Sequence, residues 1–203
     1  MKNIEVEVRG LLTSDRYASL SKQLESEGQF KTTKNRVLLD YSTFLPNANL
    51  RERQEDIRLR VTNGTPEIIV KLGRWGGSES RKELSVLAET GSFDTLVQVF
   101  GVVGLTKAML CVRKSQVYDY RGIEFALVEV PNHSFYFEAE KMVSEDLVPA
   151  AKDDIAAVCT ELGLKVFDDQ AFFQYVEKLN QEANEIFDFA SYQENYFRDR
   201  FGV

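Results

Sequence analysis

Alternation of hydrophobic and polar residues dominates roughly the first 140 positions of the chain. From Asn3 to Gly10 every second residue is apolar, which is the period of a β-strand with one polar face. Two further alternating runs, Asp56–Thr62 and Glu67–Leu72, are separated by Asn63-Gly64, a dipeptide typical of a tight hairpin turn. The same criteria predict strands over 30–45, 80–87, 106–120, 123–130 and 134–142. We therefore expect about eight strands, mostly in antiparallel hairpin order.

Helical spacing replaces alternation in three parts of the chain. A helix capped at Ser14-Asp15 is predicted to end at Gly28, and a short helix is predicted over 92–100. From Leu147 onward the period is helical throughout. Two apolar faces are predicted there: Ile155, Val158, Cys159 and Leu162 on one helix, and Phe172, Tyr175, Val176, Leu179, Ala183 and Ile186 on another. With no linker or repeat, the chain is predicted to be one α+β domain over 1–203, with strands over about 3–142 and a helical part over about 147–203.

The composition of the chain argues against some classes of binding partner. The 203 residues contain 25 Lys and Arg against 32 Asp and Glu, a net charge of −7 that argues against a nucleic-acid partner. No apolar run approaches the roughly 20 residues of a membrane span, and the charged N-terminal alternation leaves no place for a signal peptide. Cys111 and Cys159 both lie in apolar stretches, as reduced buried thiols do. We expect a cytoplasmic protein with no membrane partner.

Charged residues occur as i, i+2 pairs on single strand faces. Glu5, Glu7 and Arg9 share one face, as do Arg58 with Arg60 and Glu138 with Glu140. In any one strand this pattern is typical of a solvated face. Sheets of eight strands tend to close, however, and closure would gather both signs of charge in one lumen. Carboxylates there suit Mg²⁺ or Mn²⁺, and guanidinium groups match phosphate oxygens.

At these residues the sequence resembles a known family. Glu5-Val6-Glu7-Val8-Arg9 is similar to the ExExK signature of the CYTH domain, of the triphosphate tunnel metalloenzyme superfamily. Further elements follow in that family's order over nearly the whole chain, and the ordered set carries the resemblance. They are Asp40-Tyr41, Arg58-Leu59-Arg60, Lys71, Arg81-Lys82-Glu83, Arg113, Glu129, the Phe135–Glu140 segment (FxExE) and Ser191-Tyr192.

The resemblance implies an eight-stranded, antiparallel, closed β-tunnel that binds a triphosphate along its axis. It implies Mg²⁺ or Mn²⁺ as the cofactor, with Glu5, Glu7 and Arg9 as the catalytic residues. The implied phosphate ligands are Arg9, Arg58, Arg60, Lys71, Arg81 and Arg113. The implied metal ligands are Glu5, Glu7, Glu129, Glu138 and Glu140. Glu83 is expected to hold Arg81 or Arg9 in place.

Three positions depart from the family pattern. Arg9 replaces the signature Lys, which keeps the positive charge but removes any role as a general base. Ser115 stands where an inward Arg is expected, and Glu129 stands where the family usually has Asp. We therefore expect a divergent member with altered substrate preference or activity.

Four functions remain open from the sequence. The first is a metal-dependent hydrolase of inorganic tripolyphosphate, a nucleoside triphosphate or thiamine triphosphate. The alternatives are a class IV-type adenylyl cyclase making cyclic AMP from ATP, a non-catalytic polyphosphate- or nucleotide-binding module, and a purely structural barrel. Hydrolysis ranks first because cyclisation must also fix the sugar. The expected partner is a small-molecule triphosphate, with the chain a monomer or homodimer.

Overall fold

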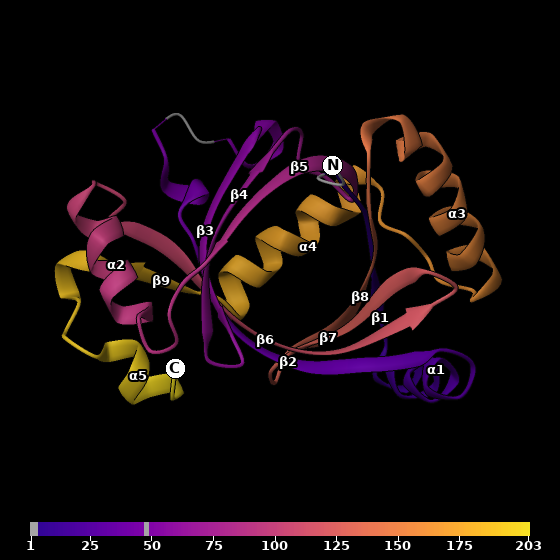
Figure 1. Cartoon of the computed structure of the whole chain (residues 1–203), viewed down its shortest axis with the longest axis horizontal. Helices are drawn as coiled ribbons and strands as arrows, with labels where there is room; N and C mark the ends of the chain where they lie inside the picture. Colours follow the sequence, from indigo (N-terminus) through magenta and orange to yellow (C-terminus); the bar gives the residue numbers. More distant parts are fainter. Residues whose placement is uncertain (1–3, 47–48) are drawn as a thin grey trace.

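The computed structural model of the chain describes residues 4–46 and 49–203, and these residues form nine strands and five α-helices (Figure 1). Eight strands close into an antiparallel barrel in the order β2-β3-β4-β5-β1-β8-β7-β6, and the pairing of β2 with β6 completes it. The strands are β1 (Ile4–Leu12), β2 (Gln29–Asp40), β3 (Glu55–Thr62), β4 (Thr65–Leu72), β5 (Ser78–Leu87), β6 (Lys107–Tyr120), β7 (Ile123–Val130), β8 (Ser134–Val143) and β9 (Glu185–Asp188). The predicted fold class is confirmed.

Local chemistry explains the turn and the first helix. Asn63 and Gly64 have φ of 49° and 83°, so both adopt the left-handed conformation that a two-residue hairpin turn requires. The first helix, α1 (Ser14–Glu27), is capped by Thr13 rather than by the predicted Ser14: the Thr13 hydroxyl accepts a hydrogen bond from the Arg16 amide. The prediction was therefore off by one residue at this helix start.

The hydrophobic cores lie outside the barrel. One core packs α1 and α3 (Val148–Glu161) against the outer faces of β1, β6, β7 and β8, with Val6, Leu20, Phe137 and Ile155 almost fully buried. A second core packs α2 (Phe93–Val102) and α5 (Tyr196–Phe201) against β2, β3 and β6. The outward residues of the strands are therefore apolar, which leaves the inward positions free to carry charge.

A third cluster holds helix α4 (Asp169–Glu182) against the barrel. Phe172 and Phe173 contact the indole of Trp75, which lies in the loop between β4 and β5 and is only 7% exposed. Trp75 thus packs the loop between β4 and β5 against α4. Figure 1 shows α4 crossing the middle of the molecule between β5 and the β6–β8 side of the barrel.

The chain after α4 differs from the prediction. Ile186 was expected on the apolar face of a helix, but α4 ends at Glu182, and Ile186 lies in the short strand β9, 66% exposed. This strand pairs with the start of β6. The aromatic residues that follow pack on the outside of the barrel, where Phe197 is fully buried. No helix within the described ranges is long and apolar enough to span a membrane.

Candidate functional site

The interior of the barrel is a charged cavity of about 180 Å³. It is lined by alternate residues of the strands, because neighbouring positions along a strand point to opposite faces. Its wall carries both signs of charge, as the sequence predicted. The charged lining residues are Glu5, Glu7, Arg9, Lys34, Arg36, Arg58, Arg60, Lys71, Glu83, Glu124, Glu138 and Glu140.

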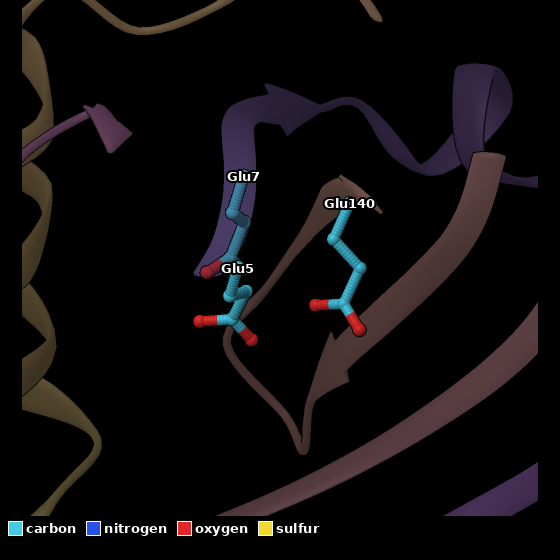
Figure 2. Close-up of side chains that lie close together, drawn as sticks. All are labelled: Glu5, Glu7 and Glu140. Atoms are coloured by element: carbon cyan, nitrogen blue, oxygen red, sulfur yellow. The ribbon is translucent and has the colours of Figure 1, made fainter. Parts of the chain in front are cut away.

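Three carboxylates gather at one side of this cavity. Glu5 and Glu7 come from β1 and Glu140 from the neighbouring strand β8, directly across from Glu7 in the ladder. One oxygen from each lies within 4.8 Å of the others (Figure 2). Burial, followed by repulsion from Glu5 and Glu138, raises the pKa of Glu140 to about 8. Burial is also the main cause that raises the pKa of Glu7. Hard oxygen donors crowded in this way fit a divalent cation.

Lys71 is the cation nearest to this acidic cluster. Its ammonium contacts Glu5 and lies 3.3 Å from Glu83 and 4.0 Å from Glu7. Burial opposes its charge, but Glu7 and Glu5 together raise the pKa of Lys71 above its ordinary value. The ammonium therefore stays protonated and partly neutralises the cluster.

Arg9 is held in one position by several acceptors. Its guanidinium contacts Glu7 and lies 3.1 Å from Glu79 and 3.3 Å from Glu138. It also donates to the carbonyl oxygen of Gly76 at 3.4 Å. Arg9 thereby orients Glu7 and Glu138. The planar guanidinium can donate to several acceptors in fixed directions, which the single ammonium of Lys cannot do.

Asp56 is the centre of a buried ionic network that is joined to the cavity by Arg58. Its carboxylate is fully buried and accepts hydrogen bonds from Arg53 at 2.7 Å, Arg58 at 2.5 Å and Arg81 at 2.5 Å. Burial alone would raise the pKa of Asp56, but Arg58, Arg81 and Arg53 hold it well below its usual range. The guanidinium of Arg81 also donates a hydrogen bond to the Glu79 carboxylate at 2.7 Å. The network fixes the guanidinium groups before any ligand binds.

Two cations of the wall have no such partner. Arg36 on β2 lies directly opposite Arg113 on β6. Within residues 4–46 and 49–203, neither forms an ion pair. Arg36 donates to the Thr62 hydroxyl at 3.3 Å, and Arg113 donates to the side-chain oxygen of Asn184 at 2.9 Å. Burial, and then the charge of Arg60, lowers the pKa of Arg36. Two half-buried cations that lie opposite each other in this way are suited to an anion.

A second cavity of about 140 Å³ adjoins the first under α4. Arg9, Arg36, Arg58 and Glu138 line both cavities. Beyond these shared residues the second cavity is mainly apolar and aromatic. Arg113 lies in its wall together with side chains of α4.

The structure brings most of the predicted site residues together. Those that line the two cavities are Glu5, Glu7, Arg9, Arg58, Arg60, Lys71, Arg113, Ser115, Glu138 and Glu140. Arg81 is 1% exposed and lies behind the wall, paired with Asp56 and Glu79. It therefore reaches the cavities only through these carboxylates.

The placement of Glu129 among the acidic residues of the lumen was wrong. In β7, Glu124 pairs with Glu140 and Ala126 with Glu138, so the even-numbered positions face inward. Glu129 has the opposite parity and faces outward across from Lys114. Glu124, which the sequence reasoning missed, is the β7 carboxylate that lines the cavity.

Other site residues were also missed. Lys34 and Arg36 are an i, i+2 pair of the same kind, within the strand predicted over 30–45. Asp56 and Glu79 have the same i, i+2 spacing, because Asp56 lies two residues before Arg58 and Glu79 lies two residues before Arg81. Arg53 precedes its strand, so alternation does not reveal it.

Comparison with known proteins shows that several solved structures have a similar fold. No family model and no curated protein matches the sequence. A conserved hypothetical protein from Pyrococcus furiosus superposes with a TM-score of 0.64 at 19% identity, covering 80% of this chain and 94% of that one. A candidate adenylate cyclase from Vibrio parahaemolyticus gives 0.61 at 15%, covering 81% and 91%. The chain has the fold of these proteins.

A further neighbour carries an activity in its description. HpAC1 from Hippeastrum, a candidate adenylyl cyclase with a dominant triphosphatase activity, superposes with a TM-score of 0.54 at 14% identity, covering 87% of this chain and 95% of that one. The closed tunnel that the resemblance to the CYTH domain implied is thus confirmed at the level of the fold.

Proposed function

We propose that the chain is a member of the triphosphate tunnel superfamily that binds a triphosphate together with a divalent cation and hydrolyses it. The observation that carries the proposal is the separation of charge within one lumen. Glu5, Glu7 and Glu140 form a compact acidic cluster, whereas Arg36 and Arg113 are cations with no carboxylate partner among residues 4–46 and 49–203. A polyphosphate bridged to a divalent cation satisfies both groups at once.

The cationic wall is the proposed site for the phosphate chain. Arg58 and Arg60 on β3, Lys71 on β4, and the opposed pair Arg36 and Arg113 all line the two connected cavities. Guanidinium groups suit this task because they offer several donors in a fixed plane. These residues bind the phosphates and stabilise negative charge as the leaving phosphate departs.

The acidic cluster is the proposed site for Mg²⁺ or Mn²⁺, with Glu5, Glu7 and Glu140 as ligands and Glu138 close by. A bound divalent cation would supply Lewis-acid stabilisation of charge on the phosphate oxygens. The carboxylates fit such an ion because their oxygens are hard donors and their crowding favours an added positive charge. Arg9 keeps Glu7 and Glu138 in position and, always protonated, does not accept a proton.

Hydrolysis is the proposed reaction because it needs only water as the second reactant. The dominant triphosphatase activity described for HpAC1, which shares the fold, is consistent with this choice. Cyclisation of ATP also requires a site that fixes the ribose against the α-phosphate, and it is therefore monitored as an alternative outcome.

The test is release of phosphate from tripolyphosphate, ATP and thiamine triphosphate with Mg²⁺ or Mn²⁺, with cyclic AMP measured in parallel. Glu5→Gln and Glu7→Gln are expected to lower turnover by about 100-fold or more, since each removes a charged ligand. Glu25→Gln, an exposed position on α1, is the control and should keep wild-type turnover.

Each other outcome identifies a different function. Turnover unaffected by Glu5→Gln and Glu7→Gln refutes the metal assignment. Cyclic AMP as the main product indicates a cyclase. Thermal stabilisation by tripolyphosphate and metal without turnover indicates a binding module, and no stabilisation at all indicates a structural barrel.

A further inference from the structure

Arg113 is held by neutral groups, unlike most cations of the tunnel wall. Its guanidinium donates to the side-chain oxygen of Asn184 at 2.9 Å and to the carbonyl oxygen of Val112 at 2.8 Å. Arg60, by contrast, pairs with the carboxylate of Glu67 at 2.7 Å. Amide and carbonyl oxygens orient a guanidinium by hydrogen bonding without cancelling its charge.

The titratable side chains with the largest effect on Arg113 are also uncharged at neutral pH. They are Cys111, Tyr136 and Tyr175. Burial raises the pKa of Cys111 to about 11, and it raises the pKa of Tyr136 and of Tyr175 above their ordinary values. The positive charge of Arg113 is therefore available to a phosphate oxygen.

Three contacts fix Asn184 in one orientation. It lies between the end of α4 and β9, and its backbone N–H donates to the carbonyl oxygen of Leu179 in α4 at 2.8 Å. Its side-chain nitrogen donates to the side-chain oxygen of Asn180 at 2.8 Å. Because a guanidinium has only donors, the side-chain oxygen of Asn184 must be the atom that faces Arg113, and the nitrogen is then left for Asn180.

The short strand β9 brings Asn184 to the wall of the barrel. Glu185, the next residue in the chain, pairs with Leu110 of β6, three residues before Arg113. This pairing holds Asn184 beside the strand that carries Arg113, whose side chain lines the second cavity. The direction of the guanidinium thus depends on the segment that follows α4.

We propose that Asn184 is a positioning residue that directs Arg113 toward the phosphate chain without neutralising its charge. This inference rests on the proposed function, in which Arg113 binds phosphate, and it deepens that function. A carboxylate at position 184 would hold the guanidinium equally well, but it would compete with the phosphate for the same positive charge.

The Asn184→Asp variant separates orientation from charge, because the two side chains have the same shape and the carboxylate still accepts from Arg113. The probe is an analogue of tripolyphosphate in which methylene groups replace the bridging oxygens, so that it resists hydrolysis, and it is titrated calorimetrically with Mg²⁺. Asn184→Asp is expected to weaken its binding about tenfold, while the melting temperature stays the same or rises. A purely structural role of Asn184 predicts instead that this conservative replacement keeps the affinity.

Two controls show whether the effect passes through Arg113. Gln181→Glu makes the same change from amide to carboxylate at an exposed position of α4 and should leave the affinity within about twofold of wild type. Arg113→Ala should weaken the analogue about tenfold, and adding Asn184→Asp to it should change the affinity by less than about twofold. Asn184→Ala is the second test should Asn184→Asp fold poorly: it removes the acceptor and should weaken the analogue about threefold, but not when Arg113 is already Ala.

The outcomes are distinct. Wild-type affinity in both Asn184 variants, or in Arg113→Ala, overturns the inference and leaves the proposed function standing. An equal loss in Gln181→Glu, or a further loss when Asn184→Asp is added to Arg113→Ala, does the same. Failure of the wild-type protein to bind either the analogue or tripolyphosphate in the presence of Mg²⁺ overturns both proposals.

Discussion

Replacing Asp56 by Asn is expected to destabilise the protein strongly. The carboxylate is 0% exposed and accepts from three guanidinium groups, at 2.7 Å from Arg53 and 2.5 Å from both Arg58 and Arg81. In the Asp56→Asn variant Arg53 retains Asp40 and Arg81 retains Glu79, but Arg58 loses its carboxylate. Loss of one partner from a buried ionic group costs about 3–5 kcal/mol.

The assay is thermal and urea unfolding at neutral pH without ligand. The expected loss corresponds to a fall in melting temperature of about 10 °C for a chain of this size. Asp153→Asn is the matched control: Asp153 is an exposed carboxylate of α3, and its replacement should change the free energy of unfolding by less than about 0.5 kcal/mol.

The pH dependence of the free energy of unfolding provides an independent test of the role of the Asp56 carboxylate. The pKa of Asp56 is held below its ordinary value, so its contribution to stability is complete above about pH 4 and is lost as the pH falls toward the folded-state pKa. The difference in stability between wild type and Asp56→Asn should therefore narrow by about 1 kcal/mol between pH 6 and pH 3. A difference below about 1 kcal/mol at pH 7, or one that does not change with pH, would refute this account of the network.

Three further predictions concern packing, orientation and thiol chemistry. Phe197→Ala should cost about 3–5 kcal/mol because the ring is fully buried, whereas Phe30→Ala, 49% exposed, should cost less than about 1 kcal/mol in the same urea titration. Arg9→Lys should lower the free energy of unfolding by about 1–3 kcal/mol, and an unchanged urea midpoint would contradict the four-acceptor geometry. Burial raises the pKa of Cys111 to about 11, so a disulfide reagent at pH 8 should react with the native protein about 100-fold more slowly than with the unfolded chain.

Alternation along the strands was sufficient to predict which charged residues share a strand face. Because Glu5, Glu7 and Arg9 alternate with buried Val6 and Val8, their common inward face followed from the sequence once the sheet was expected to close. The two cysteines are free and buried, as their apolar surroundings indicated. These inferences need only the period of a strand and the cost of burying charge.

Other features depend on information that alternation lacks. The inward parity of β7 follows from its pairing with β8, which is why Glu129 was misplaced and Glu124 was missed. The strand β9 has four residues, too few for a period to distinguish it from the end of a helix. The position of α4 over the second cavity comes from the contact of Phe172 and Phe173 with Trp75, residues about 100 positions away in the chain.

The charge of Arg36 in the tunnel wall lowers the stability of the folded protein. Arg36 lies opposite Arg113 without an ion pair in the described chain, and burial lowers its pKa, so its charge is disfavoured in the folded state. Replacing it with a neutral residue of similar length should therefore raise the melting temperature while weakening the binding of anions. Under the proposed function, thermostability screens of this protein would therefore favour variants that bind the triphosphate less well.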